Sequence, residues 1–260
     1  MICSRKGIEV VEHIQSTKNQ KVKDWKKLQL KKERDITGTY IIEGSHLIEE
    51  ALKTDDILEL MIQEGIEIPV NWLQSGRNIT TVSPEVSKVI STTKTSQGVF
   101  AVCRKKNQTK DINSYKRFLL LDAVQDPGNI GTMIRTADAA GVDVVIFGEG
   151  SGDLYNPKVI RSAQGSHFHI QTEVGNIFDW IEKLNTAEVP IYGTALENAV
   201  PFKQVDPSDS FALIMGNEGA GVNPEILQKT TRNLYIPIYG QSESLNVAIA
   251  AGILMYHLRK

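Results

Sequence analysis

Short, continuous apolar runs recur through the second half of the chain, and they limit the possible folds more than any other feature. Such runs, bounded by Gly or Asp, are typical of parallel strands that helices cover on both faces. From residue 117 to 260 we therefore predict an α/β domain built on a parallel sheet. The expected strands are FLLLDAV (118–124), VDVVIFG (142–148), VPIYGTA (189–195), FALIMG (211–216) and LYIPI (234–238), with helices expected at 129–140, 156–165 and 176–185.

The first part of the chain has a different pattern, in which short strands and helices are mixed. Strands are expected at TYIIEG (39–44), ILELMIQ (57–63) and GVFAVCRK (98–105), a helix at SHLIEEALK (45–53), and a strand leading into a helix at 79–90. The following stretch, KNQTKDINSYK (106–116), is polar throughout and fits a linker. We predict two domains, a smaller mixed α/β domain over 1–105 and the parallel-sheet domain over 117–260.

Composition excludes several classes of protein. No apolar run is long enough to cross a membrane, and the N-terminus lacks the apolar stretch of a signal peptide. Cys3 and Cys103 are the only cysteines and have no metal-ligand spacing, so a disulfide framework is not expected. We expect a cytoplasmic protein with no membrane segment and no bound metal.

Charge is distributed unevenly along the chain, whose net charge is -2. Residues 1–34 hold ten Lys or Arg against four Asp or Glu. Within 18–34, Val22, Trp25 and Leu28 recur every three residues, which predicts a helix with a narrow apolar stripe. The basic face of this helix is either an ordinary solvated surface or an arm that contacts phosphates. In the second case the candidate RNA-binding residues are Lys21, Lys27, Lys31 and Arg34.

Three loops of the second domain, each after an expected strand, are rich in glycine and polar residues. They are DAVQDPGNIGTMIRTADAAG (122–141), IMGNEGAGVNPE (214–225) and IPIYGQSESLN (236–246). Ligands of open parallel sheets bind beyond the carboxyl ends of the strands, so the three loops can converge on one ligand. Each loop alone is more often a tight turn. Because the GxGxxG fingerprint is absent, a nucleotide-dependent oxidoreductase is disfavoured.

The last of these loops leads into a helix that is apolar on every side, so we expect the helix to be buried. Its apolar residues run from Val247 to Met255. Either Ser242 or Ser244 is expected to cap it.

The three loops, taken in order, resemble the motifs of the SpoU/TrmH family of the SPOUT methyltransferases, across roughly residues 117–260. The segment from NQKVKDWKKLQL to SHLIEEAL resembles the L30e-like substrate-binding domain of the same family. The resemblance implies a parallel sheet with a deep trefoil knot, a homodimer, and transfer of a methyl group from S-adenosylmethionine to a ribose 2′-hydroxyl of rRNA or tRNA. The alternative is a non-catalytic RNA-binding protein that retains the fold.

The resemblance also implies roles for individual residues. It places Arg135 at the ribose hydroxyl; since a guanidinium stays protonated, we expect Arg135 to hold a phosphate or ribose oxygen rather than remove a proton. Glu218 is expected to bond to Asn129 or to backbone donors and so to hold two loops together. The implied catalytic residues are Asn129, Arg135, Glu218, Ser244 and Asn246, and the implied cofactor-binding residues are Gly216, Ile236, Leu245, Thr194 and Leu196.

One further segment, RSAQGSHFHI (161–170), also resembles a stretch of the family. Arg161 is expected to be structural or to reach RNA. His167 and His169 alternate along an apparent strand, so we expect both on one side of it. Without a Cys or carboxylate partner at ligand spacing, they do not predict a metal site.

Overall fold

The structure is a computed structural model that describes residues 10–106 and 111–260. It divides into two compact units, one of Met1–Asn107 with Tyr155–Arg161, the other of Gln108–Leu154 with Ser162–Lys260. The segment 155–161, which falls within the predicted second domain, thus belongs to the first unit. Residues 107–110 of the predicted linker lie outside the described residues.

The first unit is built on a five-stranded mixed sheet in the order β1-β4-β3-β5-β2. The mixed α/β fold predicted for this part is confirmed, and the expected strands and helices form within a residue or two of their predicted bounds. The strands are β1 (Val10–Ile14), β2 (Thr39–Glu43), β3 (Ile57–Gln63), β4 (Ile79–Val82) and β5 (Val99–Arg104). The helices are α1 (Gln20–Lys27), α2 (Lys31–Thr37), α3 (Ser45–Leu52), α4 (Val70–Leu73), α5 (Pro84–Ile90) and α7 (Pro157–Ala163), whose residues 157–161 are in this unit.

The basic segment forms two helices instead of the single helix expected over 18–34. α1 ends at Lys27 and α2 begins at Lys31. The predicted apolar stripe is nevertheless confirmed, because Val22, Trp25 and Leu28 are all buried in the core of the first unit. Their burial fixes which side of α1 faces the sheet.

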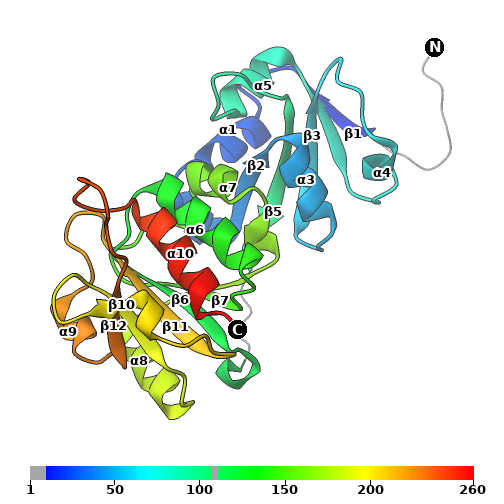
Figure 1. The fold of residues 1–260 in the computed structure, drawn as a ribbon. Helices are drawn as coiled ribbons and strands as arrows, with labels where there is room; N and C mark the ends of the chain where they lie inside the picture. Colours follow the sequence, from blue (N-terminus) through cyan, green and yellow to red (C-terminus); the bar gives the residue numbers. More distant parts are fainter. Residues whose placement is uncertain (1–9, 107–110) are drawn as a thin grey trace. The chain divides into compact units, whose positions relative to one another are not determined.

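The second unit contains a seven-stranded sheet in the order β10-β12-β9-β11-β6-β7-β8, and every strand pair in it is parallel. The predicted parallel sheet is therefore confirmed (Figure 1). Two strands were not predicted: β8, which is mostly half-buried, and β10, which has only two residues. The strands are β6 (Arg117–Asp122), β7 (Val144–Phe147), β8 (Gln171–Val174), β9 (Ile191–Thr194), β10 (Val200–Pro201), β11 (Phe211–Gly216) and β12 (Arg232–Tyr235).

Helices cover this sheet as expected for buried parallel strands. α8 (Ile177–Thr186) and α9 (Pro224–Leu227) share a core with alternate residues of β6, β7 and β11. α10 (Val247–Leu258) packs on β11 and lies side by side with α6 (Pro127–Ala139) (Figure 1). Strands β6 and β11 pair in register up to Asp122 and Gly216. The loops that follow these two strands therefore leave the sheet at the same edge.

The prediction that the last helix is buried all round is wrong. Ala248, Ala251, Leu254, Met255 and Leu258 face the core. On the other side, Ile249 is 55% exposed, Ile253 37% and Tyr256 57%. The sequence does not distinguish the two sides because both are apolar.

The strand expected at His167 and His169 is also wrong. Ser166–Phe168 is a short 3-10 helix instead. His167 is buried, whereas His169 is exposed and its Nδ1 lies 3.1 Å from Asp138 Oδ2. No group of three or more potential metal ligands occurs among residues 10–106 and 111–260. Within the same described ranges, no helix has the length and hydropathy needed to cross a membrane.

Candidate active site

The first of the three loops begins where β6 ends and leads into α6. Asp126 caps the helix, since its Oδ1 accepts a hydrogen bond from the Asn129 backbone amide at 2.9 Å. Pro127 occupies the first helical position, where its missing N–H is not needed. The cap fixes the first turn of α6 and places the Asn129 side chain, which is half-buried, at the edge of the sheet.

Glu218, in the second loop, holds that turn from the other side. Its Oε1 accepts hydrogen bonds from the Asp126 backbone amide at 2.9 Å and from Asn129 Nδ2 at 3.1 Å. Its Oε2 accepts from the Gln125 backbone amide at 3.2 Å. The expected contact between Glu218 and Asn129 is present, and it joins the loops after β6 and β11.

These hydrogen bonds also determine the charge state of Glu218. Partial burial raises the pKa of its carboxyl group, but the hydrogen bonds from Asn129 and the backbone amides favour the ionised form and outweigh it. The net effect is a pKa below the ordinary value of 4.5. Glu218 is therefore a carboxylate at neutral pH and acts only as an acceptor.

The third loop joins the same network through Asn246. The Asn246 Oδ1 caps α10 by accepting from the backbone amides of Ala248 at 3.0 Å and Ile249 at 3.3 Å. Its Nδ2 donates to Asn129 Oδ1 at 2.9 Å. A serine cap was expected and is not found; instead Ser242 Oγ donates to the Ser244 carbonyl at 2.8 Å. One asparagine thus both caps the helix and links all three loops.

A cavity of about 1030 Å³ opens between these loops. This volume is at the upper end of the range for small-molecule sites, about 300–1,000 Å³. Nine of the ten residues that the resemblance assigned to catalysis and cofactor binding line the cavity. They are Asn129, Thr194, Leu196, Gly216, Glu218, Ile236, Ser244, Leu245 and Asn246.

Backbone packing in the cavity wall explains why a glycine occupies position 216. A Cβ atom there would lie 2.1 Å from the Gly221 carbonyl carbon and from the Val222 nitrogen. The second loop therefore folds back tightly on its own start, and Asn217 and Gly221 exchange two backbone hydrogen bonds. A backbone this close-packed is typical of loops that approach a ligand with N–H and C=O groups.

Sequence reasoning missed two residues that hold these loops. Asn217 Nδ2 donates to the Ala123 carbonyl at 2.9 Å, and its Oδ1 accepts from the backbone amides of Gly219 and Ala220, both at 3.0 Å. Asp122 Oδ2 accepts from the Asn223 backbone amide at 2.7 Å. Both residues stand at strand ends, beside the glycines that marked the loops, and that position was the available signal.

Comparison with known proteins agrees with this geometry. Residues 116–256 match the SpoU rRNA Methylase family, and residues 19–101 match the MRM3-like substrate binding domain. The chain is 51% identical over 250 residues to the 23S rRNA (guanosine(2553)-2'-O)-methyltransferase RlmP of Bacillus subtilis, a match that covers 96% of this chain and 100% of the relative.

The chain belongs to the SpoU rRNA Methylase family.

Solved structures of the family have the same fold. An rRNA methyltransferase from Sinorhizobium meliloti with bound AdoMet superposes with a TM-score of 0.86 at 30% identity, covering 96% of this chain and 98% of that one. The SpoU methyltransferase AviRb from Streptomyces viridochromogenes with AdoMet gives a TM-score of 0.81 at 25% identity, covering 93% and 97%. The predicted SPOUT fold, the cofactor S-adenosylmethionine and the activity of an RNA 2′-O-ribose methyltransferase are confirmed. The non-catalytic alternative gains no support.

Arg135 is the one predicted catalytic residue of this SpoU-family chain that does not line the cavity. It lies on α6, two turns beyond Asn129, and is exposed. Arg161, for which two roles were open, donates from Nη1 to Thr92 Oγ1 at 2.7 Å within the first unit. This contact favours the structural role.

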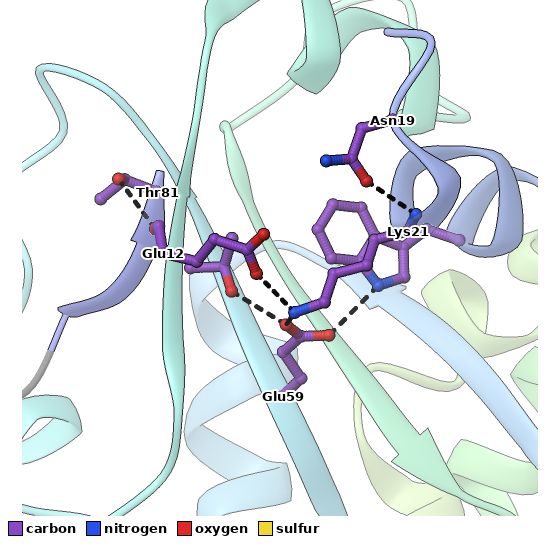
Figure 2. A network of polar contacts seen from close by, with 7 residues as sticks. Glu12, Asn19, Lys21, Glu59 and Thr81 are labelled. Atoms are coloured by element: carbon purple, nitrogen blue, oxygen red, sulfur yellow. Dashed lines mark hydrogen bonds and ion pairs between the residues drawn. The ribbon is translucent and has the colours of Figure 1, made fainter. Parts of the chain in front are cut away.

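The candidate RNA-binding residues of the first unit have different environments. Arg34 is 3% exposed and donates to the Leu28 carbonyl at 2.7 Å, so its proposed contact with RNA does not fit the structure. Lys21 points between two carboxylates, Glu12 at 2.7 Å and Glu59 at 3.3 Å (Figure 2). Lys27 is exposed and pairs with Asp24 at 3.0 Å, and Lys31 is exposed.

Proposed function

We propose that this SpoU-family enzyme methylates the 2′-hydroxyl of one nucleotide in 23S rRNA, the RNA named for its relative from Bacillus subtilis. The relative's name specifies guanosine 2553, and the high identity over the whole of that relative supports the same target here. The observation that carries the proposal is the chain of hydrogen bonds from Glu218 through Asn129 to Asn246 at the cavity.

The cavity fits S-adenosylmethionine in size and in the kind of groups that line it. We infer that the backbones of Gly216, Ile236 and Leu245 hold the cofactor, with Thr194 and Leu196 on its adenine side. Thr194 is fixed for this role, since its Oγ1 donates to the Ile214 carbonyl at 3.1 Å. When bound, the cofactor supplies a sulfonium methyl group, which is already an activated electrophile.

The residues of the chain then have mainly to orient the ribose. Asn129 is held at both ends of its amide, by Glu218 and by Asn246, so its position beside the cavity is fixed before substrate binds. Positioning of this kind can remove about 7–11 kcal/mol from a barrier. Ser244 lines the same part of the cavity and helps to orient the reacting groups.

Arg135 lies outside the cavity wall, and this location supports a contact with the RNA rather than with the cofactor. We propose that its guanidinium holds a phosphate or ribose oxygen of the target nucleotide and stabilises negative charge there. In Arg135→Ala, we expect cofactor affinity measured by calorimetry to be unchanged and the methyl-transfer rate to fall by about 10²–10³-fold. Comparable turnover in the variant would remove Arg135 from the mechanism.

We further propose that the enzyme is a cytoplasmic homodimer with the trefoil knot of the family. The exposed apolar side of α10, formed by Ile249, Ile253 and Tyr256, supports a dimer because an apolar surface of this kind is stabilised by a partner. Light scattering that showed a fully active monomer would contradict this part of the proposal.

The main test is a map of 2′-O-methyl groups in rRNA and tRNA from cells with and without the gene. We expect one methyl group to be lost from 23S rRNA, at the position equivalent to guanosine 2553 of the relative. Purified enzyme with S-adenosylmethionine should restore it in rRNA from the deletion strain. An unchanged map would contradict the proposed target.

A further inference from the structure

The lysines of α1 divide into two groups that face opposite ways. Lys21 lies four residues before Trp25, so both are on the side of α1 that faces the sheet. There Lys21 Nζ contacts Glu12 and Glu59, and Trp25 Nε1 donates to Glu59 at 3.2 Å (Figure 2). The charge of Lys21 is therefore balanced within the first unit.

Lys23 and Lys26 are one helical turn apart on the opposite side of α1, away from the buried stripe. Both are exposed, and neither forms an ion pair or a side-chain hydrogen bond with another described residue. Lys31 and Lys32, at the start of α2, are exposed and lack such partners within the same described ranges. We call these four residues, Lys23, Lys26, Lys31 and Lys32, the corner surface.

The corner surface concentrates positive charge in a chain that is acidic overall. Its four cations fall within one short stretch around the turn between α1 and α2, whereas the whole chain has a net charge of -2. Leu30, in the same turn, is 61% exposed. An unpaired lysine can contact a phosphate without first breaking an ion pair, which Lys21 would have to do.

We propose that the corner surface binds the phosphate backbone of the RNA substrate, and that Lys21 and Arg34 serve the fold instead. This inference rests on the proposed function, because it takes RNA as the partner. Lysine contacts to phosphates give affinity and orientation but carry no sequence information. The corner surface therefore attaches the first unit to RNA, and the choice of nucleotide is made elsewhere.

The dependence of RNA affinity on salt tests this assignment directly. The full-length protein carrying Lys23→Gln, Lys26→Gln, Lys31→Gln and Lys32→Gln is titrated against a transcribed 23S rRNA fragment by fluorescence anisotropy at several salt concentrations. Each lost phosphate contact should reduce the slope of log K against log salt by about 0.7–0.9, so the full variant should lose about 3. A slope equal to that of the wild type would overturn the inference.

Lys21→Gln is the matched control, since it removes one positive charge from the same helix. We expect it to leave the salt slope unchanged; a reduction as large as that of Lys23→Gln would also overturn the assignment. Circular dichroism of each variant checks that the fold is retained. Methyl transfer by the wild type is measured separately: if the wild type methylates 23S rRNA but the corner variant keeps its slope, this inference alone fails. If the wild type methylates no RNA, the proposed function fails.

Discussion

Glu218 in the second unit and Glu59 in the first each accept three hydrogen bonds, but the donors differ. Glu218 receives two from backbone amides and one from Asn129, all in the loop that begins α6. Glu59 receives its three from the side chains of Lys21, Trp25 and Thr80, on α1 and β4 (Figure 2). The first carboxylate orders loops around a cavity, and the second fastens a helix to a sheet. The same chemical group thus serves a site in one unit and packing in the other.

The largest expected difference between the two carboxylates is in activity. Glu218→Ala removes the acceptor that holds Asn129, so the amide and the first turn of α6 lose their fixed position. We expect the methyl-transfer rate to fall on the order of 10²-fold, since small displacements in an active site have effects of this size. Single-turnover kinetics with saturating cofactor measures it.

The comparison would break if Glu59→Ala lowered the single-turnover rate as much at saturating RNA. Equal rates for wild type and Glu218→Ala would break it from the other side.

Stability should show the opposite order. Glu59→Ala leaves Thr80, which is 1% exposed, and the part-buried Trp25 Nε1 without their acceptor. We expect a loss of about 1–3 kcal/mol in the free energy of unfolding of the first unit, the cost of an unsatisfied buried polar group. Denaturant unfolding followed by tryptophan fluorescence measures it. Glu59→Gln, which keeps a side-chain oxygen as acceptor, should lose less, and an equal loss would argue against the hydrogen bonds as the cause.

The acid sensitivity of the second unit should depend on Glu218. Because its folded pKa is below the ordinary value of 4.5, its stabilising effect is complete above that value and is lost as the pH falls through the folded pKa. The difference in melting temperature between the wild type and Glu218→Gln should therefore be constant at neutral pH and shrink in more acidic buffer. A difference that grew on acidification would contradict the sign of this shift.

The smallest effect is expected for the ion pairs of Lys21. Hydrogen bonding to Glu12, which outweighs the opposing effect of partial burial, raises the pKa of the Lys21 ammonium group, but its side chain is 48% exposed. Lys21→Gln should therefore lower the free energy of unfolding by only about 0.2–1 kcal/mol, and less at high salt. Urea titrations at two salt concentrations test this. A loss as large as that of Glu59→Ala would show that the ion pairs, rather than the contacts of Trp25 and Thr80, fasten α1.

Local patterns in the sequence predicted most of the secondary structure and the site. Continuous apolar runs became the parallel strands β6, β7, β9, β11 and β12, because burial on both faces requires such runs. Glycine and polar residues at strand ends marked the loops that line the cavity. These features could be predicted because each depends on residues that are neighbours in the chain.

Predictions that concerned the surroundings of a single side chain were less successful. Arg34 was expected at the surface and is buried, and His167 was expected beside His169 on a strand but lies in a 3-10 helix. The cap of α10 was expected from serine and comes from Asn246. In each case the composition of the segment permitted more than one arrangement.

The sequence by itself determined the α/β class, the apolar stripe of α1, and the three loops that identify the family, because periodicity and turn chemistry act over a few residues. Only the tertiary structure decided that Lys21 is neutralised by Glu59, 38 positions away, and that Asn246 reaches Asn129, 117 positions away. It also decided which side of α10 is buried. The physical reason is that the energy of a charge, an amide or an apolar face depends on what folding brings next to it, and local spacing does not specify those neighbours.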